Sequence, residues 1–334
     1  MSTLTSSPSP VTTEAARRGP RLSGLNWLVW RQHRAAFWTL IAGTVVSVAW
    51  MVYQRGQMMD FLNGYGWPHP KSDSWEQNFS RGPLGQTGLI LGYIPILLGV
   101  FLGAPLLAGD LENGTAKLVT SQAVSRFRWL GTKLGISTLV VVAGTVALSA
   151  AFGWWWGPVK TSSYILDWTD PSAFDNTGPV PVALALLTVV GGVAIGMLLR
   201  RTLMSMVVTF GFAVAVQVVW SFTRLSLGHA VTITTSHGVL ADNSFPKLPN
   251  AAYQLDQSYL TSSGKLLGYS TCREESTTKA AAACLDKAHV VGWSVKYLPM
   301  SQMSAMQWLG ASILLALTAA ITVFIFVWGR KRLI

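Results

Sequence analysis

Long apolar stretches alternate with polar segments along the 334-residue chain, and this alternation predicts the fold. A helix that spans a membrane needs about 20 mostly apolar residues, and six stretches reach that length. They lie between Arg34 and Arg55, and at about Gly85–Ala108, Leu134–Trp156, Val180–Leu199, Thr202–Phe222 and Met306–Trp328. We call them helices one to six in chain order. Only two residues separate helices four and five, which must therefore form a tight antiparallel hairpin. The pattern predicts an all-α integral membrane protein with six transmembrane helices.

The polar segments between these helices fall into two sets that differ in charge. One set, which includes both ends of the chain, has 14 basic residues and only three acids, Glu14, Asp110 and Glu112, so it holds the whole net charge of +11. The other set holds 11 basic and 11 acidic residues. Because basic loops resist translocation, this asymmetry predicts that both termini are cytoplasmic. The basic character therefore reflects topology, and no aromatic-basic pattern indicates nucleic-acid binding.

Composition agrees with a multi-pass protein of the cell membrane, because half of the residues are hydrophobic and only 12% are charged. The first 21 residues are rich in Ser, Thr and Pro and lack the apolar core of a signal peptide. We expect residues 1–21 to form a disordered cytoplasmic tail and residues 22–334 to form one six-helix transmembrane domain.

The predicted spans have no Asp, Glu, Lys, Arg or His in the middle. A charge there costs at least about 2.5–3.5 kcal/mol and is usually kept for function, so its absence argues against an ion-coupled transporter or a charge-lined channel. Glycines recur instead, at Gly88, Gly92, Gly99 and Gly103 in helix two and at Gly191, Gly192 and Gly196 in helix four. These rows fit either a close, movable helix interface or ordinary packing of small residues.

The segment between helices two and three, residues 109–133, carries an acidic pair on the basic side of the protein. Asp110 and Glu112 precede Gly114 and Thr115. These residues suit the start of a new helix, because glycine tolerates unusual backbone angles and a threonine side chain accepts from free N–H groups.

After this turn, apolar residues fall on one helical face: Val119, Ala123, Phe127 and Leu130. We expect a short amphipathic helix parallel to the membrane surface, with Arg126, Arg128 and Lys133 near the lipid headgroups. A polar loop without a partner is the alternative.

The same segment resembles the first cytoplasmic loop of ABC-2 type transporter permeases, most closely those of an actinobacterial branch of ABC transporter permease subunits. That branch has an acidic pair followed by Gly-Thr, and then Gln-x-x-x-Arg-x-x-Trp-x-x-x-Lys after a threonine. The matching residues here are Asp110, Glu112, Gly114 and Thr115, and then Gln122, Arg126, Trp129 and Lys133. One departure is Asp110, where the branch usually has Glu.

Two other places carry the same resemblance. Trp30-Arg31-Gln32-His33-Arg34 is similar to the Trp-Arg-Gln-His-Arg that precedes helix one in that branch. Before the last helix, Tyr297-Leu298-Pro299 and Gln307-Trp308 are similar to its Tyr-x-Pro and Gln-Trp. With the six-span layout, the resemblance extends from about residue 24 to the C-terminus.

In this family, a helix in the first cytoplasmic loop docks in a groove of a separate ATPase. The resemblance implies that ATPase coupling depends on Asp110, Glu112, Gly114, Thr115, Gln122 and Arg126. It also implies that residues 24–34 form a connecting helix in the membrane surface, with Trp30 in that surface and Arg31 and Arg34 available to the acidic pair, including a link to Glu112.

The implied partners are an ABC ATPase subunit, a second permease in a homodimer, and the lipid bilayer. The chain has no Gly-x-x-x-x-Gly-Lys-Ser/Thr loop to cradle nucleotide phosphates. We therefore expect this chain to bind no cofactor, and ATP and Mg²⁺ to bind the partner subunit.

The polar segment at residues 223–304, between helices five and six, predicts an extracellular cap. Its two cysteines, Cys272 and Cys284, favour a disulfide in an oxidising compartment; two free thiols are the alternative. The histidines of this segment lack metal-ligand spacing, so we expect no metal site. Before helix four, Asp170 and Asp175 lie in a turn-rich loop, where we expect a solvated turn rather than acid–base catalysis.

Together these features predict the membrane-spanning subunit of an ATP-driven exporter of a lipophilic or amphipathic solute, and no enzyme. By resemblance to the family, the solute path is expected along helices two and five, where Gln217 and Thr209 are candidate contacts. A hydrogen bond between helices is the alternative role for Gln217. The competing function is a non-transporting membrane sensor or immunity protein. A membrane enzyme is disfavoured, because no polar cluster marks an active site.

Overall fold

The computed structural model describes residues 24–70, 72, 74–114, 125–241, 244–273, 275 and 277–332. Within these residues, six helices are long and apolar enough to cross a membrane, as the hydropathy pattern predicts. They are α2 (Arg34–Gly64), a composite helix two from Gly82 to Glu112, α8 (Arg126–Trp156), α10 (Val180–Leu199), α11 (Thr202–Thr223) and α13 (Met303–Arg332). The predicted tail, residues 1–21, lies outside the described part of the chain.

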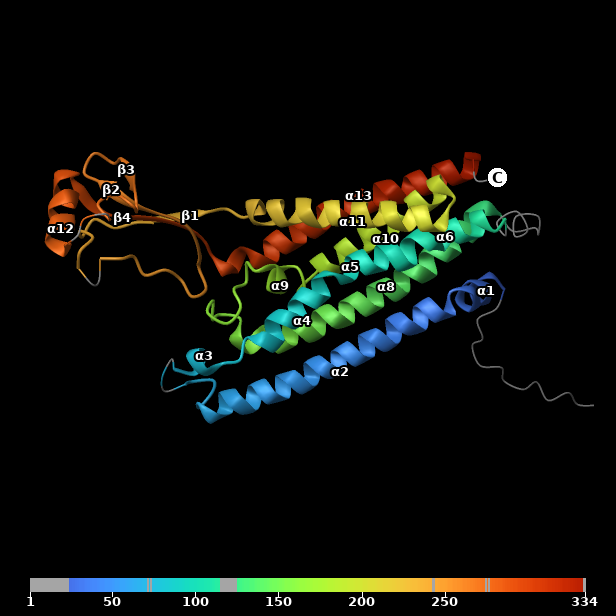
Figure 1. Cartoon of the computed structure of the whole chain (residues 1–334), viewed down its shortest axis with the longest axis horizontal. Helices are drawn as coiled ribbons and strands as arrows, with labels where there is room; N and C mark the ends of the chain where they lie inside the picture. The colour runs from blue at the N-terminus through green and yellow to red at the C-terminus, as the bar shows by residue number, and fades with distance from the viewer. Residues whose placement is uncertain are drawn as a thin grey trace, which may run out of the picture.

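Helix α10 is the central helix of the bundle, and most of its side chains are buried. It packs against α13, α11, α8 and helix two. By contrast, α2 lies at the margin and contacts chiefly α8 (Figure 1). The arrangement makes helix two and α10 the packed centre, with α2 and α11 largely exposed around it.

The described chain begins and ends at the same end of the bundle (Figure 1), which we call the terminal end. This end carries α1 (Leu25–Gln32), the last turn of helix two, and the short turn between α10 and α11. The opposite end, which we call the sheet end, carries α3 (Ser74–Asn78), α9 (Pro171–Phe174) and a β-sheet. Short 3₁₀ turns flank the long helices at η2 (Gly157–Val159), η3 (Arg224–Leu227) and η4 (Met300–Gln302).

Two of the helices extend well beyond the apolar stretches that predict them. At 1.5 Å per residue, the 31 residues of α2 and of α8 span about 46 Å, more than the roughly 30 Å of a bilayer's hydrocarbon core. Helix α2 continues past Arg55, whose guanidinium lies 3.9 Å from the centroid of the Trp154 ring in α8. Polar residues therefore lengthen these helices outside the apolar core, where hydropathy alone places loops.

Helix two is interrupted, because proline has no N–H and cannot continue the helical hydrogen bonds. It consists of α4 (Gly82–Gly92), α5 (Ile94–Leu98), the π-helical turn η1 (Gly99–Gly103) and α6 (Ala104–Glu112). Pro95 lies at the start of α5 and Pro105 at the start of α6. A π-helical turn inside a helix is uncommon and often marks a functional region.

Four of the glycines, Gly99, Gly103, Gly192 and Gly196, lie where helices two and four touch, whereas a Cβ atom on Gly92 would meet nothing within 4 Å. A Cβ atom on Gly103 would lie 2.5 Å from the carbonyl oxygen of Val189, and one on Gly192 would lie 2.7 Å from the carbonyl oxygen of Gly99. The two backbones therefore touch directly, as in small-residue interfaces of membrane helices. Gly191 faces another way, toward Phe212 of α11.

The long segment between α11 and α13 folds into a four-stranded antiparallel sheet with one helix. The strands are β1 (Val231–Thr234), β2 (Tyr253–Thr261), β3 (Leu266–Gly268) and β4 (Val290–Leu298), in the spatial order β1-β4-β2-β3. Helix α12 (Thr278–Lys287) precedes β4. The small core of this unit consists of Tyr259, Leu285, Trp293 and Val295.

The expectation of an all-α protein is wrong for this segment, residues 223–304. The central strand β4 places Trp293, Val295 and Tyr297 at every second position, and aromatic and β-branched residues with that period favour a strand. A nine-residue strand is much shorter than a membrane span, so the apolar runs that mark the spans do not mark β4.

Candidate functional site

A buried ion pair joins three elements at the terminal end. Lys133, about two turns into α8, is fully buried, and its Nζ pairs with a carboxylate oxygen of Asp110 in α6. The same Nζ donates to the carbonyl oxygen of Leu106 at 3.1 Å. From α1, the side-chain amide of Gln32 donates to the other carboxylate oxygen of Asp110. These contacts tie α1, α6 and α8 to one another.

Two rings complete this site, which we call the terminal junction (Gln32, His33, Asp110, Trp129 and Lys133). The Trp129 ring is buried, with Lys133 Nζ 5.1 Å from its centroid. The pKa of His33 is lowered to about 4, chiefly by burial and next by the positive charge of Lys133, while Asp110 acts in the opposite direction. A neutral imidazole suits this place, because a protonated one would add a second cation beside Lys133.

The second acid of the pair, Glu112, binds a different helix. Its carboxylate accepts from the backbone N–H of Thr202, the first residue of α11, at 2.8 Å. A carboxylate at a helix N-terminus satisfies a free N–H and interacts favourably with the helix dipole. Residues two apart on a helix point in different directions, so the acidic pair reaches toward both α8 and α11.

Helix two ends just after these acids in the backbone conformation that glycine favours. Gly114 has a φ of 70°, a left-handed angle that L-residues with a side chain rarely adopt. The chain is described again from Ser125, whose hydroxyl accepts from the N–H of Arg128 at 3.3 Å and caps α8. The predicted contacts of Thr115 and Gln122, and the amphipathic helix expected through residues 119–123, lie outside the described residues. Arg126 begins α8, but its side chain also lies outside them.

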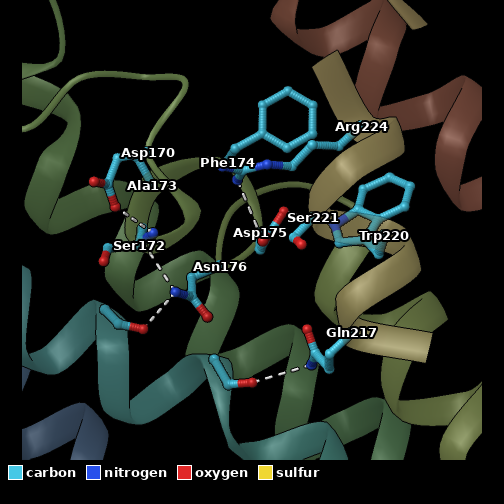
Figure 2. Close-up of polar contacts among 12 residues, drawn as sticks. Asp170, Ser172, Ala173, Phe174, Asp175, Asn176, Gln217, Trp220, Ser221 and Arg224 are labelled. Atoms are coloured by element: carbon cyan, nitrogen blue, oxygen red, sulfur yellow. Dashed lines mark hydrogen bonds and ion pairs between the residues drawn. The ribbon is translucent and has the colours of Figure 1, made fainter. Parts of the chain in front are cut away.

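A second buried ion pair lies at the sheet end (Figure 2). Arg224, just after α11, pairs with Asp175, with 3.3 Å between Nη1 and Oδ2. The indole N–H of Trp220 donates to Oδ1 of the same carboxylate at 2.7 Å. The Arg224 guanidinium also lies 5.8 Å from the centroid of the Phe174 ring. We call Phe174, Asp175, Asn176, Trp220 and Arg224 the sheet-end cluster.

Opposing effects act on the carboxylate of this cluster. Burial raises the pKa of Asp175, while the charge of Arg224 and the hydrogen bonds from Trp220 and Arg224 lower it. The net direction is upward. The charged form of Asp175 is therefore stabilised in this buried position by Arg224.

Asp175 belongs to a short segment, residues 170–177, that is inserted between helices and that we call the wedge. Asn176 donates to the carbonyl oxygen of Gly88 in helix two at 2.7 Å (Figure 2). Gln307 of α13 donates to the carbonyl oxygens of Phe174 and Thr177 at 2.8 and 3.0 Å. A Cβ atom on Gly88 would lie 2.5 Å from Cβ of Ser172, so only glycine allows this approach. The wedge therefore contacts helix two, α11 and α13 together.

The comparison with protein families decides the identity of this bundle. The family described as "ABC-2 membrane transporter related" matches residues 41–224, more than half of the chain. The chain belongs to this family. No curated protein and no solved structure matches it.

Membership in the ABC-2 family makes this chain a multi-pass membrane permease, and it implies an ATPase subunit as partner. The matched range begins inside α2 and ends at Arg224. It includes Asp110 and Lys133 of the terminal junction and the whole sheet-end cluster. It does not include α1, the β-sheet or α13.

The terminal junction differs from what the permease's sequence leads us to expect. Lys133 was expected near the lipid headgroups, and this expectation is wrong, because the side chain is fully buried against Asp110. Among the described residues, neither Arg31 nor Arg34 forms an ion pair with Glu112; Gln32, the residue between them, reaches Asp110 instead. The signal was present in the spacing, since Trp129 and Lys133 lie four apart and share one face of α8.

Of the other connecting-helix residues of the permease, Trp30 is half-buried, and Arg31 and Arg34 are exposed. The Trp30 ring packs on Phe37, with centroids 5.2 Å apart, and edge-on to Trp38. The Arg31 guanidinium lies 5.0 Å from the centroid of the Trp27 ring, and Arg34 is exposed at the first position of α2.

The two candidate path residues of the permease both contact helices inside the bundle. Gln217 Nε2 donates to the carbonyl oxygen of Gly92 at 3.2 Å (Figure 2), which is the helix-to-helix hydrogen bond left open as the alternative. Thr209 is fully buried, and its methyl group faces Gly192. In this conformation, helix two and α11 are therefore bonded to each other where the path was expected.

Two further predictions concern the sheet end, one on the cysteines and one on the turn before helix four. Cys272 and Cys284 form a disulfide that joins the segment after β3 to α12. The expected solvated turn before helix four is wrong for Asp175, which is largely buried, because Arg224 and Trp220 from α11 take the place of solvent. Asp170 does serve a turn, since its carboxylate accepts from the N–H of Ser172 at 2.7 Å.

Proposed function

We propose that this permease is the membrane-spanning subunit of an ATP-driven exporter, and that a separate ATPase drives it from the terminal end. The observation that carries the proposal is the terminal junction. It connects α6 and α8 through one buried ion pair and α1 to α6 through the hydrogen bond from Gln32, and residues 115–124, where the family's ATPase contact is expected, separate α6 from α8 in the sequence.

The junction suits the transmission of force, because its parts do not separate easily. Removing one partner of a buried ion pair typically costs about 3–5 kcal/mol, since the other charge stays buried and unpaired. A displacement of the segment between α6 and α8 would therefore move both helices and α1 together. Through Glu112 and Thr202, the same displacement would reach the start of α11.

We assign the terminal end to the cytoplasm and the sheet end to the outside. Of the residues in the basic polar segments, Arg31, Arg34, Arg200 and Arg201 are described and lie at the terminal end, and an excess of basic residues marks the cytoplasmic side. The disulfide between Cys272 and Cys284 lies at the other end, where an oxidising compartment would keep it formed.

At the outer end, the wedge serves as the closure of the exit. It bonds to helix two through Asn176, to α11 through Asp175 and to α13 through Gln307. If the solute passes between helix two and α11, as expected for the family, these contacts must separate before it leaves. The described spans carry their charged groups near their ends, which favours a lipophilic or amphipathic solute.

The proposal also includes a second copy of the permease, with the solute path between the copies, and ATP and Mg²⁺ bound by the ATPase subunits. These assignments rest on the family resemblance. A non-transporting sensor or immunity protein stays the competing function.

The test is copurification of the tagged chain from its own membranes in mild detergent, followed by mass spectrometry and an ATPase assay. We expect an ATP-binding-cassette protein and ATP hydrolysis with the wild-type chain, and uncoupled or absent hydrolysis with Asp110→Asn. Lys160→Met is the matched control, because Lys160 is exposed at the sheet end and should change neither result. Recovery of the chain alone, without ATPase activity, would favour the sensor or immunity function.

A further inference from the structure

The sheet and α12, which together we call the sheet unit, stand beyond the end of the bundle (Figure 1). The chain enters this unit after η3 and leaves it before η4. At this base, the side chain of Gln302 accepts from the backbone N–H of His229 at 2.7 Å and donates to its carbonyl oxygen at 2.9 Å. A Cβ atom on Gly228 would lie 2.8 Å from the sulfur of Met306. The entry to the sheet unit is therefore held closely against the start of α13.

A second attachment comes from the loop that precedes the wedge. Trp168 in this loop is the largest fully buried side chain of the described residues. Its indole N–H donates to the carbonyl oxygen of Ala251, 83 residues away, at 2.7 Å. Ala251 and Tyr253, at the start of β2, pack on the same apolar cluster as Trp168. Because this loop lies between α8 and α10, the contact ties the sheet unit to a different part of the bundle.

The residue that accepts this hydrogen bond has a strained backbone. Ala251 has a φ of 54°, a left-handed angle that residues with a side chain rarely adopt. Residues in such conformations persist only where the surrounding structure holds them. The strained residue is the one whose carbonyl oxygen Trp168 binds, which indicates a specific joint between the loop and the sheet unit.

Trp168 is also continuous with the wedge. The carboxylate of Asp167 accepts from the N–H and the hydroxyl of Thr169, both at 2.9 Å, and fixes the turn that leads into the wedge. The Trp168 ring lies 6.4 Å from the Phe174 ring, and the Phe174 ring lies 6.4 Å from the Trp220 ring, measured between centroids. Trp168 therefore contacts the sheet-end cluster on one side and the sheet unit on the other.

We propose that Trp168 is a positioning residue that links the sheet unit to the wedge, so that release of the wedge displaces the sheet unit. The inference rests on the proposed role of the wedge as the closure of the exit. The base at Gln302 is the pivot of this movement, because the chain passes between the bundle and the sheet unit there. The joint of Trp168 with Ala251 transmits the movement of the wedge to the unit.

The test measures the position of the sheet unit and needs neither transport nor an ATPase. Spin labels are attached at Asp60→Cys in α2 and at Lys279→Cys in α12, two exposed positions, and their distance distribution is measured by electron paramagnetic resonance in nanodiscs. We expect a narrow distribution for the otherwise wild-type chain and at least a doubling of its width for Trp168→Phe. Trp156→Phe is the matched control, because Trp156 is also buried but its indole N–H has no acceptor among the described residues.

A second pair of variants perturbs the same joint from the sheet unit. Glycine adopts a φ of 54° readily, so Ala251→Gly should keep the carbonyl oxygen in place and leave the distribution narrow. A β-branched residue is strongly disfavoured at this angle, so Ala251→Val should move the carbonyl oxygen and broaden the distribution as Trp168→Phe does. This pair tests the joint without changing the core around Trp168.

The link to the wedge is tested at Asn176, which bonds to Gly88 of helix two. Asn176→Leu releases that contact and should broaden the distribution of the sheet unit. When Trp168→Phe is already present, Asn176→Leu should add no further broadening, because the link is then broken. A purely structural role of Trp168 would instead make the two effects additive.

Two results would overturn the proposal. One is a distribution that stays narrow in both Trp168→Phe and Ala251→Val. The other is a sheet unit whose position does not respond to Asn176→Leu, or responds equally with and without Trp168→Phe. Neither result depends on whether the chain exports a solute, so failure of the link and failure of the proposed function can be told apart.

Discussion

The two ends of the bundle each hold a buried ion pair, but they are built differently. At the terminal end, the fully buried Lys133 pairs with the carboxylate of Asp110, which also accepts from Gln32. At the sheet end, the pair of Asp175 and Arg224 is one member of a wider set of hydrogen bonds from Trp220, Asn176 and Gln307. The contacts of the terminal end centre on one carboxylate that pairs with a buried lysine, whereas those of the sheet end involve several residues of the wedge.

This difference predicts how the contacts at each end separate. A single buried charge pair is broken all at once, because neither charge is stable without the other. A set of neutral hydrogen bonds, each worth about 0.5–1.5 kcal/mol, opens in steps. The terminal junction should therefore move as one body, while the wedge should be released contact by contact.

The largest expected effect comes from breaking the terminal pair. Lys133→Met leaves Asp110 buried without its cation and should lower the free energy of unfolding by about 3–5 kcal/mol, seen as a lower melting temperature in detergent. The double variant Lys133→Met, Asp110→Leu removes both charges and should regain much of that loss. A double variant as unstable as the single one would show that the ion pair is not the cause.

Breaking the sheet-end pair should cost less and should depend on pH. Arg224→Met removes the cation that keeps Asp175 charged, and we expect a loss of about 2–3 kcal/mol at pH 7.5. Because burial raises the pKa of Asp175, acidification neutralises that carboxyl and should restore part of the lost stability. The measurement is the melting temperature at pH 7.5 and at pH 5.5; a loss that is equal or larger at pH 5.5 would contradict the assignment.

Single neutral hydrogen bonds to helix two should have smaller effects, one from the wedge and one from α11. Asn176→Leu leaves the carbonyl oxygen of Gly88 without its side-chain donor and should cost about 1–3 kcal/mol. Gln217→Leu, which removes a 3.2 Å bond to Gly92, should cost about 1 kcal/mol. If these contacts of helix two with the wedge and with α11 open independently, the two losses should add in the double variant; a strongly non-additive result would show one cooperative unit instead.

The smallest expected effect is the titration of His33. Its pKa falls from 6.5 to about 4 on folding, so its contribution to stability is complete above pH 6.5 and is lost as the pH falls toward 4. Between pH 6.5 and 5.5 the wild-type chain should lose up to about 1 kcal/mol. His33→Gln should flatten this part of the melting-temperature profile; an unchanged profile would assign the titration to another group.

The sequence predicts the spans well, because a long apolar run has few alternatives to a membrane helix. The bounds of helix four, Val180–Leu199, agree with those of α10. Of the residues that carry the family resemblance, Gln32, His33, Asp110, Trp129 and Lys133 lie together at the terminal end, with Asp110 at the centre, whereas Tyr297 and Gln307 lie toward the sheet end.

The partners of these residues could not be predicted, because they are distant in the sequence. Lys133 looks like a surface cation until Asp110, 23 residues away, is placed beside it. Asp175 looks solvated in the sequence, because Arg224, with which it pairs, lies 49 residues away, just after α11. Hydropathy describes the preference of a side chain for water or lipid, but burial of a charge depends on its tertiary partner. The sheet was not predicted for another reason: its strands are short, and their alternation of apolar and polar residues is a weaker signal than the long apolar runs of the spans.

The interruption before Pro95 gives helix two the mechanics of two short rods joined at a hinge. The rod at the terminal end, α6 with η1, is fastened to Lys133 and α10, while the rod at the sheet end, α4, is fastened to the wedge. A straight rod would tilt as a whole, and opening one end would open or shut the other at the same instant. Two hinged rods allow both ends to be shut together for a time. A membrane protein that passes through such an occluded state moves its solute without ever presenting a continuous pore through which ions would leak.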